Sequence, residues 1–415
     1  MRKDKNVPKI RFKEFDTEWS SSTLADEGTF YYGRSCPKWS VTKDATIPCI
    51  RYGELYTKFG AKIDKVYSYT NISPDNLRFS NGLEVLIPRV GEDPKDYNHC
   101  TWLSIPNVAI GEMISVYNTI NNPLFTSIML NATMQDEFAK RVEGGSVTNL
   151  YYEKLKNIKV FFPSKLEQEK IGSYFENIDN LISLQKEKYE KLLNLKKAML
   201  NKLFPKEGEN TPEIRFDGFI DEWEKKKLLE FGESTSGVSM ESEFNKNGQL
   251  KVISIGSYSE NSKYIDQGIR SSINNKTSNR ILSKDDLTMI LNDKTASGNI
   301  IGRVLLIEEN NKYIYNQRTE RIEIYKEKFN PNFLYQMLNS NYIRSKIIKL
   351  AQGNTQIYVN WSTIKEIEYL IPRQYNEQKT IGEYFSKLDK LIELNKAKLE
   401  KLKNIKSSLL DNMFV

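Results

Sequence analysis

The sequence "EQEKIGSYFENIDNLISLQKEKYEKLLNLKKAMLNKLF" occupies Glu167–Phe204, and "EQKTIGEYFSKLDKLIELNKAKLEKLKNIKSSLLDNMF" occupies Glu377–Phe414. The two stretches align without a gap and are identical at 19 of 38 positions. Each follows an apolar run that ends in Pro ("IKVFFP" and "IEYLIP"), and each opens with Glu, which favours a helix N-terminus. The chain is therefore predicted to contain one long helix twice.

Both stretches carry apolar residues at heptad spacing, which predicts a coiled-coil seam. One helix of 38 residues is about 57 Å long. Because such a stripe is too long to bury against one compact module, the two helices are expected to pack on each other, antiparallel. The predicted seam consists of Ile171, Phe175, Ile178, Ile182, Tyr189, Leu192, Met199 and Leu203, with Ile381, Phe385, Leu388, Ile392, Leu399, Leu402, Leu409 and Met413.

One polar residue interrupts the seam at the same place in each helix, Gln185 in the first and Asn395 in the second. A buried amide in a seam costs stability but fixes register and partner, so the two amides are candidates to pair. A solvated kink at this position is the alternative.

A second repeat lies near the start of each half. "PKIRFKEFDTEW" (Pro8–Trp19) and "PEIRFDGFIDEW" (Pro212–Trp223) share seven of twelve residues, 204 residues apart. We interpret this signature as an entry strand with an aromatic clasp. Its Phe and Trp side chains are expected to pack the module against a helix end.

Between the signatures and the helices lie two regions with β-type runs, each followed by one helical segment that Gly144 or Gly353 is predicted to cap. The fold class is therefore predicted to be α+β, with two similar modules and two long helices in an antiparallel coiled coil of pseudo-two-fold symmetry. The loops of the two modules differ more than their predicted strands and helices. This contrast indicates that the modules share an assembly role and recognise different targets; neutral drift after duplication is the alternative. The predicted domains are residues 1–163, 164–206, 207–372 and 373–415.

Composition leaves several classes of protein open and excludes others. The 415 residues give room for two or three domains, and the net charge of +7 permits nucleic-acid binding without requiring it. No apolar run approaches ~18 residues, and the first residues lack the apolar stretch of a secretory signal. Three cysteines are typical of a reducing cytoplasm.

The chemistry that is missing argues against an enzyme. No Gly-Lys dipeptide exists for a phosphate-binding loop, and His99 is the sole histidine. Cys36, Cys49, His99 and Cys100 lack the spacing typical of a zinc site. "NNPLF" (Asn121–Phe125) looks like the adenine-binding loop of methyltransferases, but "NPNF" (Asn330–Phe333) recurs at the same place, so a repeated helix start is favoured. No catalytic, cofactor or metal site is predicted in this chain.

Basic, amide and aromatic side chains cluster on the predicted loops of both modules. Arg and Lys read guanine, Asn and Gln read adenine, and each can hold phosphate. Any single one is more simply a solvated loop residue, so the repeated set carries the hypothesis. The candidates are Arg34, Lys38, Trp39, Arg51, Tyr52, Tyr56, Lys58, Arg89, Lys95 and Asn98 in the first module, and Asn292, Lys294, Thr295, Ser297, Asn299, Asn316, Gln317, Arg318 and Arg321 in the second.

These patterns resemble the specificity subunit of type I restriction–modification enzymes over nearly the whole chain. The second half reads "GNTQIYVNWSTIKEIEYLIP", then "NEQKTIGEYFSKLDKLIEL", and the first reads "GGSVTNLYYEKLKNIKVFFP", then "LEQEKIGSYFENIDNLISL". The run "NQRTERI" also looks like the family pattern. The first half lacks its own Asn-Thr-Gln and Asn-Gln-Arg, so residue assignments are weaker there.

The resemblance implies two target-recognition domains, each reading half of an asymmetric bipartite site in double-stranded DNA. It implies that the helices bind two methyltransferase subunits, which methylate adenine with S-adenosylmethionine. Two restriction/translocase subunits that use ATP and Mg²⁺ would join them, and the complex would be cytoplasmic, with no membrane partner. This subunit itself would have no activity.

Two rival readings remain. A fused methyltransferase–specificity chain would need a Gly-rich cofactor loop that is not present. A coiled-coil DNA-binding protein without sequence preference would be distinguished by selection from random duplexes.

Overall fold

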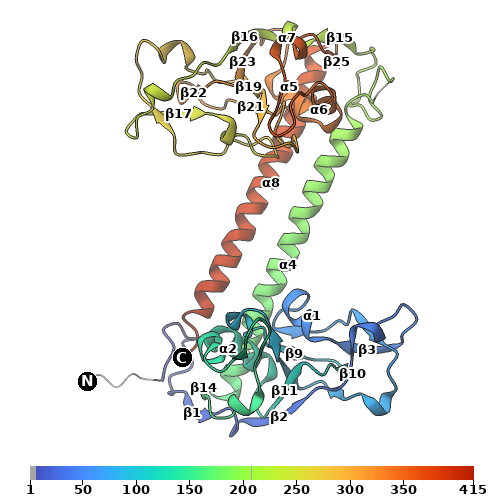
Figure 1. Ribbon diagram of the computed structural model, residues 1–415, viewed down its shortest axis with the longest axis vertical. Coiled ribbons are helices and arrows are strands. Elements are labelled where there is room, and N and C mark those ends of the chain that lie inside the picture. Colours follow the sequence, from blue (N-terminus) through green and yellow to red (C-terminus); the bar gives the residue numbers. More distant parts are fainter. Residues whose placement is uncertain (1–5, 207) are drawn as a thin grey trace. The chain divides into compact units, whose positions relative to one another are not determined.

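The computed structural model describes residues 6–206 and 208–415; residues 1–5 and 207, which belong to the two predicted modules, lie outside the described residues. The chain forms two compact units. The first combines the chain up to Lys186 with Lys398–Val415, and the second is Glu187–Ala397. Two long helices, α4 (Lys165–Lys202) and α8 (Tyr375–Leu410), each contribute one part to each unit (Figure 1).

The first unit is built on small sheets around one central sheet of order β2-β11-β7-β9-β4. A second sheet has the order β5-β3-β10-β6, a third β12-β13-β8, and β1 pairs with β14. The strands are β1 (Ser20–Thr23), β2 (Gly28–Tyr32), β3 (Ile47–Ile50), β4 (Lys62–Ile63), β5 (Ser68–Thr70), β6 (Phe79–Asn81), β7 (Glu84–Pro88), β8 (Val90–Gly91), β9 (Thr101–Leu103), β10 (Pro106–Ile110), β11 (Ile114–Thr119), β12 (Glu143–Gly144), β13 (Thr148–Asn149) and β14 (Lys159–Phe162). The short helices are α1 (Tyr52–Thr57), α2 (Pro123–Thr133) and α3 (Gln135–Ala139).

The second unit repeats this plan. Its central sheet has the order β16-β23-β19-β21, matching β2-β11-β7-β9, and its remaining sheets are β15-β25, β18-β17-β22 and β20-β24. The strands are β15 (Glu224–Lys227), β16 (Gly232–Ser236), β17 (Leu250–Ile253), β18 (Arg270–Ser271), β19 (Leu287–Ile290), β20 (Asn292–Asp293), β21 (Val304–Leu306), β22 (Tyr313–Tyr315), β23 (Thr319–Ile324), β24 (Ile357–Tyr358) and β25 (Glu368–Ile371). The helices are α5 (Pro331–Asn339), α6 (Asn341–Ile348) and α7 (Trp361–Ile364).

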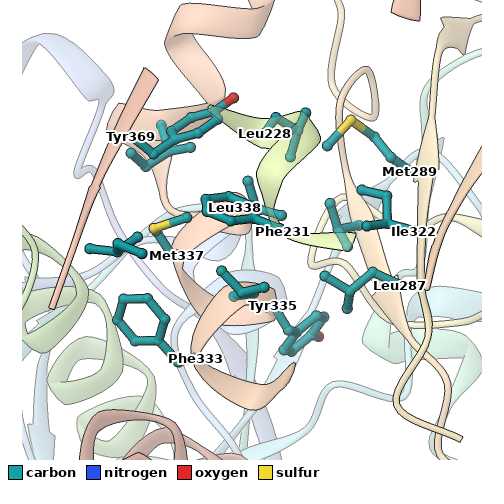
Figure 2. Close-up of a cluster of buried hydrophobic side chains, with 14 of the residues drawn as sticks. Leu228, Phe231, Leu287, Met289, Ile322, Phe333, Tyr335, Met337, Leu338 and Tyr369 are labelled. Atoms are coloured by element: carbon teal, nitrogen blue, oxygen red, sulfur yellow. The ribbon is translucent and has the colours of Figure 1, made fainter. Parts of the chain in front are cut away.

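One helix in each unit packs its apolar face on the central sheet. In the second unit, Phe333 and Leu338 of α5 lie in one buried cluster with Leu287 and Ile322 of the sheet (Figure 2). All four side chains are almost fully buried, and truncating a buried Phe typically costs about 3–5 kcal/mol. This cluster fixes the sheet that positions the loops described below.

The segment predicted as one helix is two helices in each unit, so that prediction is wrong in detail. In the second unit Ser340 adopts an extended conformation (ψ 145°) between α5 and α6, which interrupts the helical hydrogen bonds. In the first unit Met134 (φ −102°, ψ 2°) separates α2 from α3.

The predicted helix caps at Gly144 and Gly353 are also wrong. The preceding helices end at Ala139 and Ile348. Gly144 is the last residue of β12 and Gly353 follows the bridge residue Gln352, so each stands where a hairpin turn begins, with φ of +122° and +99°. A Cβ would come within 2.5 Å of the Val147 oxygen in the first turn and 2.1 Å of the Gln356 oxygen in the second. Only glycine fits there, because these turns close hairpins.

The signature repeat is not a strand, contrary to expectation. Residues 8–19 and 212–223 contain turns and irregular chain, and the strands begin just after them, at Ser20 and Glu224. As irregular chain, the signature can lie against helix ends, where its side chains make the contacts described below.

Candidate nucleic-acid interface

An Arg of each signature clamps the first turn of the following long helix. Arg11 donates two hydrogen bonds of 2.7 Å to the Glu167 carboxylate, whose side chain is fully buried. Arg215 does the same with Glu377 at 2.6 and 2.7 Å, and Trp223 Nε1 adds a third bond at 3.2 Å. The hydrogen bond to Glu167 raises the pKa of Arg11. Two parallel bonds fix the angle of the pair as well as its distance.

The next helix residue, Gln168 or Gln378, anchors the shorter helix of its unit. Gln168 Oε1 accepts from the Asn122 amide at 2.9 Å, and Gln378 Oε1 accepts from the Asn330 amide at 3.0 Å. Both Asn side chains cap the helix that follows, with bonds of 2.9 and 3.0 Å to the amides of Phe125 and Phe333. The helix-start interpretation of "NNPLF" is confirmed.

Aromatic residues close each clasp, as predicted. Trp19 lies against Phe125 and Phe414, with ring centroids 5.8 and 6.3 Å apart. Trp223 lies against Phe333 and Phe204 at 6.0 and 6.2 Å. In each unit, therefore, the Phe just beyond the end of one long helix packs beside the start of the other.

The helix pieces within each unit run antiparallel. In the first unit Lys406 of α8 bonds Asp179 of α4 at 2.5 Å while Phe414 lies against Phe175. In the second unit Lys196 bonds Asp389 at 2.6 Å while Phe204 lies against Phe385. In both cases a later residue of one helix meets an earlier residue of the other, with the same register.

The predicted seam residues differ in depth. Ile178, Leu388 and both amides, Gln185 and Asn395, are buried, whereas Leu192 and Leu402 are half-buried. Asn395 Nδ2 also donates to the Leu391 oxygen at 2.7 Å. Pairing of the two amides stays a prediction.

A preformed loop of the second unit, residues 293–300, carries four of its nine candidate readers. The buried Asp293 carboxylate accepts from the amides of Thr295 and Ile300, at 2.9 and 3.0 Å, and Arg344 donates to the Gly298 oxygen from beneath. These bonds hold the loop backbone from inside. The exposed side chains of the loop are Lys294, Thr295, Ser297 and Asn299, and the half-buried Asn292 precedes them on β20.

Sequence reasoning did not include the neighbouring hairpin among the site residues. Gln352 and Tyr358 exchange two backbone hydrogen bonds of 2.9 Å, and β24 pairs with β20, so that Tyr358 lies opposite Asn292. The hairpin exposes Asn354, Thr355 and Gln356 beside the loop 293–300. The "GNTQ" run, which belongs to the family pattern, is the sequence feature that could have identified this hairpin as part of the site.

The "NQRTER" residues divide into two groups. Arg318 is exposed at φ +69°, and its oxygen accepts from the Leu291 amide at 2.9 Å, which places it beside the loop; the exposed Gln317 bonds Glu241 at 3.2 Å. Arg321, by contrast, pairs with Asp286 at 2.8 Å and Glu323 at 2.9 Å. Asn316 is buried and bonds Glu241 at 2.9 Å. Arg321 and Asn316 therefore hold the frame.

In the first unit several candidates also hold loops. Tyr56 OH donates to the Val90 oxygen at 2.9 Å, Lys58 pairs with Glu54 at 2.8 Å, and Asn98 donates to the Asn131 oxygen at 2.9 Å. The Arg89 guanidinium stacks on Tyr32, 4.8 Å from the ring centroid. Arg51 is half-buried just before α1.

Six first-unit candidates are exposed: the ion-paired Lys58, and Arg34, Lys38, Trp39, Tyr52 and Lys95. Trp39 is 72% exposed, an unusual position for an indole. Lys38 and Trp39 share the turn between β2 and β3, whereas Tyr52 begins α1 and Lys95 follows β8. The hairpin β12–β13 pairs with β8, as β24 pairs with β20 in the second unit.

The three cysteines are buried and do not form one group. The buried Cys36 and Cys49 share one apolar cluster, whereas Cys100 lies in another, and no group of three potential ligands that could hold a metal occurs within residues 6–206 and 208–415. None of the helices in the described part of the chain is long and apolar enough to cross a membrane.

Comparison with known proteins places these features in a family. The family model described as the type I restriction modification DNA specificity domain matches residues 94–194 and 220–404. The type I restriction enzyme MjaVIII specificity subunit of Methanocaldococcus jannaschii is 27% identical over 305 residues, which cover 71% of this chain and 70% of that protein.

Two solved structures share the fold. A type I restriction–modification S subunit from M. genitalium superposes with a TM-score of 0.65 at 15% identity, covering 99% of both chains. A structure from work on complex assembly and conformational transition of the type I R-M system gives 0.53 at 14% identity, over 95% of this chain and 97% of that one. Because the family model matches more than half of the chain, in both halves, the protein belongs to the type I restriction–modification DNA specificity family.

Proposed function

We propose that each unit reads one half of an asymmetric, bipartite site in double-stranded DNA. The supporting observation is that the two units share their buried scaffold contacts but differ in their exposed loops. The buried clasps Arg11–Glu167 and Arg215–Glu377 are the same in both units, whereas the exposed loop chemistry differs. Two copies of one scaffold with different reading loops read two different half-sites. The reading parts are residues 1–163 and 207–372.

In the second unit the reading surface joins the loop 293–300, the hairpin 352–358 and Arg318. It offers Lys294 and Arg318 for guanine or phosphate, and Asn354 and Gln356 for adenine. In the first unit the exposed candidates are spread over separate loops, with Trp39 and Lys38 on one of them. The two half-sites should accordingly differ in sequence.

The helices recruit the catalytic partners in this proposal. Leu181 and Leu184 are 53% and 63% exposed on α4, and Leu391 and Leu394 are 49% and 66% exposed at the matching positions of α8. Exposed leucines repeated on one helix face suit an apolar partner surface. Each pair would bind one methyltransferase subunit that methylates adenine with S-adenosylmethionine. Two ATP- and Mg²⁺-dependent restriction subunits would join them in the cytoplasm, and this chain would carry no chemistry.

Methylome sequencing of a host that carries this chain with its methyltransferase subunits tests the proposal. The expected result is one asymmetric bipartite motif with a fixed gap, methylated at adenine. The absence of any motif, together with random selection of duplexes by the purified chain, would instead identify a DNA-binding coiled-coil protein without sequence preference.

A further inference from the structure

A cleft of about 470 Å³ lies inside the second unit, between the loop 260–263, helix α5 and the helix pieces of α4 and α8. It borders the reading loop. Asn299, a candidate reader, donates to the Glu260 carboxylate at the rim at 2.8 Å, and Arg303 on the wall donates to the Asn299 oxygen at 3.3 Å. The cleft therefore adjoins the reading loop.

Five cationic side chains line this cleft, and two of them are neutralised. Lys196 pairs with Asp389 at 2.6 Å and Lys263 with Glu393 at 2.8 Å. The other three, Lys197, Arg303 and Lys396, form no ion pair with any residue in 6–206 or 208–415.

The only other carboxylate on the lining is Glu260, so the unpaired charges leave the cleft positive. Burial, with the nearby Arg344, lowers the pKa of Arg303 to about 10, which still leaves the guanidinium charged at neutral pH. A concave site with surplus positive charge attracts an anion.

The cleft is preformed. Ser262 has φ +58°, a conformation that is strained for a residue with a side chain. It is held by a 2.6 Å bond from its Oγ to Asn339 Oδ1 and by a 2.9 Å bond from Tyr335 OH to its oxygen. The surrounding contacts thus keep the loop over α5 before any ligand binds.

We propose that Lys197, Lys396 and Arg303 hold backbone phosphates of the DNA just outside the second half-site. The inference rests on the proposed function, because it needs a duplex on the reading loop. DNA carries one negative charge per ~1.7 Å of helix axis, so a bound duplex brings phosphates to a bordering positive cleft. Such contacts hold the DNA in place without reading bases.

The contact should be confined to the second unit. In the alignment of the two long helices, Lys197 of α4 corresponds to Ser407 of α8, so the first unit lacks this lysine. The DNA flanking the first half-site should therefore depend less on helix lysines.

The test uses the full chain assembled with its methyltransferase subunits and compares two double variants. Lys197→Gln with Lys396→Gln removes two cleft charges. Lys188→Gln with Lys398→Gln removes the same charge from the same helices, but about 180° and 200° around them, at ~100° per residue. All four lysines are exposed, so neither variant should disturb folding.

DNA affinity is measured against salt concentration, together with ethylation interference and methylation mapping. The cleft variant should lower the log–log salt slope by about 1.8, at ~0.9 per phosphate, and lose interference at phosphates outside the second half-site. Its methylated sequence should not change, and the control variant should keep the wild-type slope and interference.

Three results would overturn the inference. An equal loss of slope in the control would mean that bulk charge is responsible. Loss of methyltransferase assembly without DNA would identify an acidic protein surface as the occupant. An unchanged salt slope in the cleft variant, with the sequence specificity of the wild-type complex intact, would refute this phosphate contact alone. A wild-type complex without any specific methylation would instead refute the proposed function itself.

Discussion

Arg11 and Glu167 form a bidentate ion pair, with two hydrogen bonds of 2.7 Å, in which the Glu167 side chain is fully buried. The pair joins the N-terminal signature to the first turn of α4. Arg215 and Glu377 repeat it at the first turn of α8. This relationship explains why Arg and Glu are among the residues that the two halves share.

Replacing Arg11 with Ala should destabilise the first unit by about 3–5 kcal/mol, because it leaves a buried carboxylate unpaired. Hydrogen exchange should show faster opening of the first unit's core amides and unchanged exchange in the second unit. Lys170→Ala is the control, because Lys170 pairs with Glu14 at the exposed surface, where a pair contributes at most about 1 kcal/mol. Equal effects of the two changes would contradict a structural role for the clasp.

Replacing Lys294 and Arg318 with Ala should weaken recognition of only the half-site that the second unit reads. Each lost base contact costs roughly 1–3 kcal/mol, and a lost phosphate contact weakens binding uniformly. Binding to duplexes with single substitutions in either half-site measures this.

Arg321→Ala is a useful contrast to the Lys294 and Arg318 changes. It should destabilise the second unit, because Asp286 is 1% exposed and loses its partner. Equal weakening of both half-sites by the Lys294 and Arg318 changes would show that they are not local readers.

The turn that carries Gln317 should loosen in acid. Hydrogen bonds from Ser239 first, and then from Asn316, lower the pKa of Glu241 from 4.5 to about 2. A carboxyl group whose pKa is lower in the folded state contributes stability above its unfolded pKa. That contribution is lost as the pH falls from about 4.5 to about 2. Amide exchange of residues 316–318 should rise over this window, and Glu241→Gln should remove the pH dependence. A flat profile in the unmodified chain would refute the linkage.

Changing Leu391 and Leu394 to Glu should abolish binding of the methyltransferase subunit to the second unit without unfolding it. The side chains are 49% and 66% exposed, so the charges stay in water in the free chain and are buried only in the complex. Sedimentation of mixtures gives the stoichiometry, with a loss of one methyltransferase subunit expected. The matched change of Leu181 and Leu184 should release the other subunit. Full assembly of both variants would place the docking surface elsewhere.

A fragment of residues 1–206 should form a two-fold dimer. In the full chain Phe414 fills the pocket formed by Trp19, Phe125 and Phe175, and Phe204 fills the equivalent pocket of the second unit. A second fragment can supply its own Phe204 where Phe414 is missing. Analytical ultracentrifugation should show the dimer. With methyltransferase subunits it should mark a palindrome of the first half-site. A monomer, or a dimer that marks the asymmetric site, would show that the two helix ends are not interchangeable.

The duplication, the two long helices and the helix starts at Pro123 and Pro331 can be predicted from the amino-acid sequence. These features depend on local patterns: heptad spacing, an Asn-Pro cap and a repeated string. The helices α4 and α8 confirm the two long helices that periodicity predicted, but they begin two residues earlier, at Lys165 and Tyr375, and end at Lys202 and Leu410, before Phe204 and Phe414.

Which polar residues support the fold and which face solvent depends on long-range packing. Arg318 and Arg321 are three residues apart in "NQRTER", yet one is exposed at the loop and the other pairs with Asp286. Gly144 and Gly353 stand at hairpins instead of helix ends. Arg11 pairs with Glu167, which is 156 residues away in the sequence. A charged or glycine residue has the same local signature in either role. Its role depends on which distant strand or helix the packed core brings beside it, and this long-range information is not encoded in any short stretch.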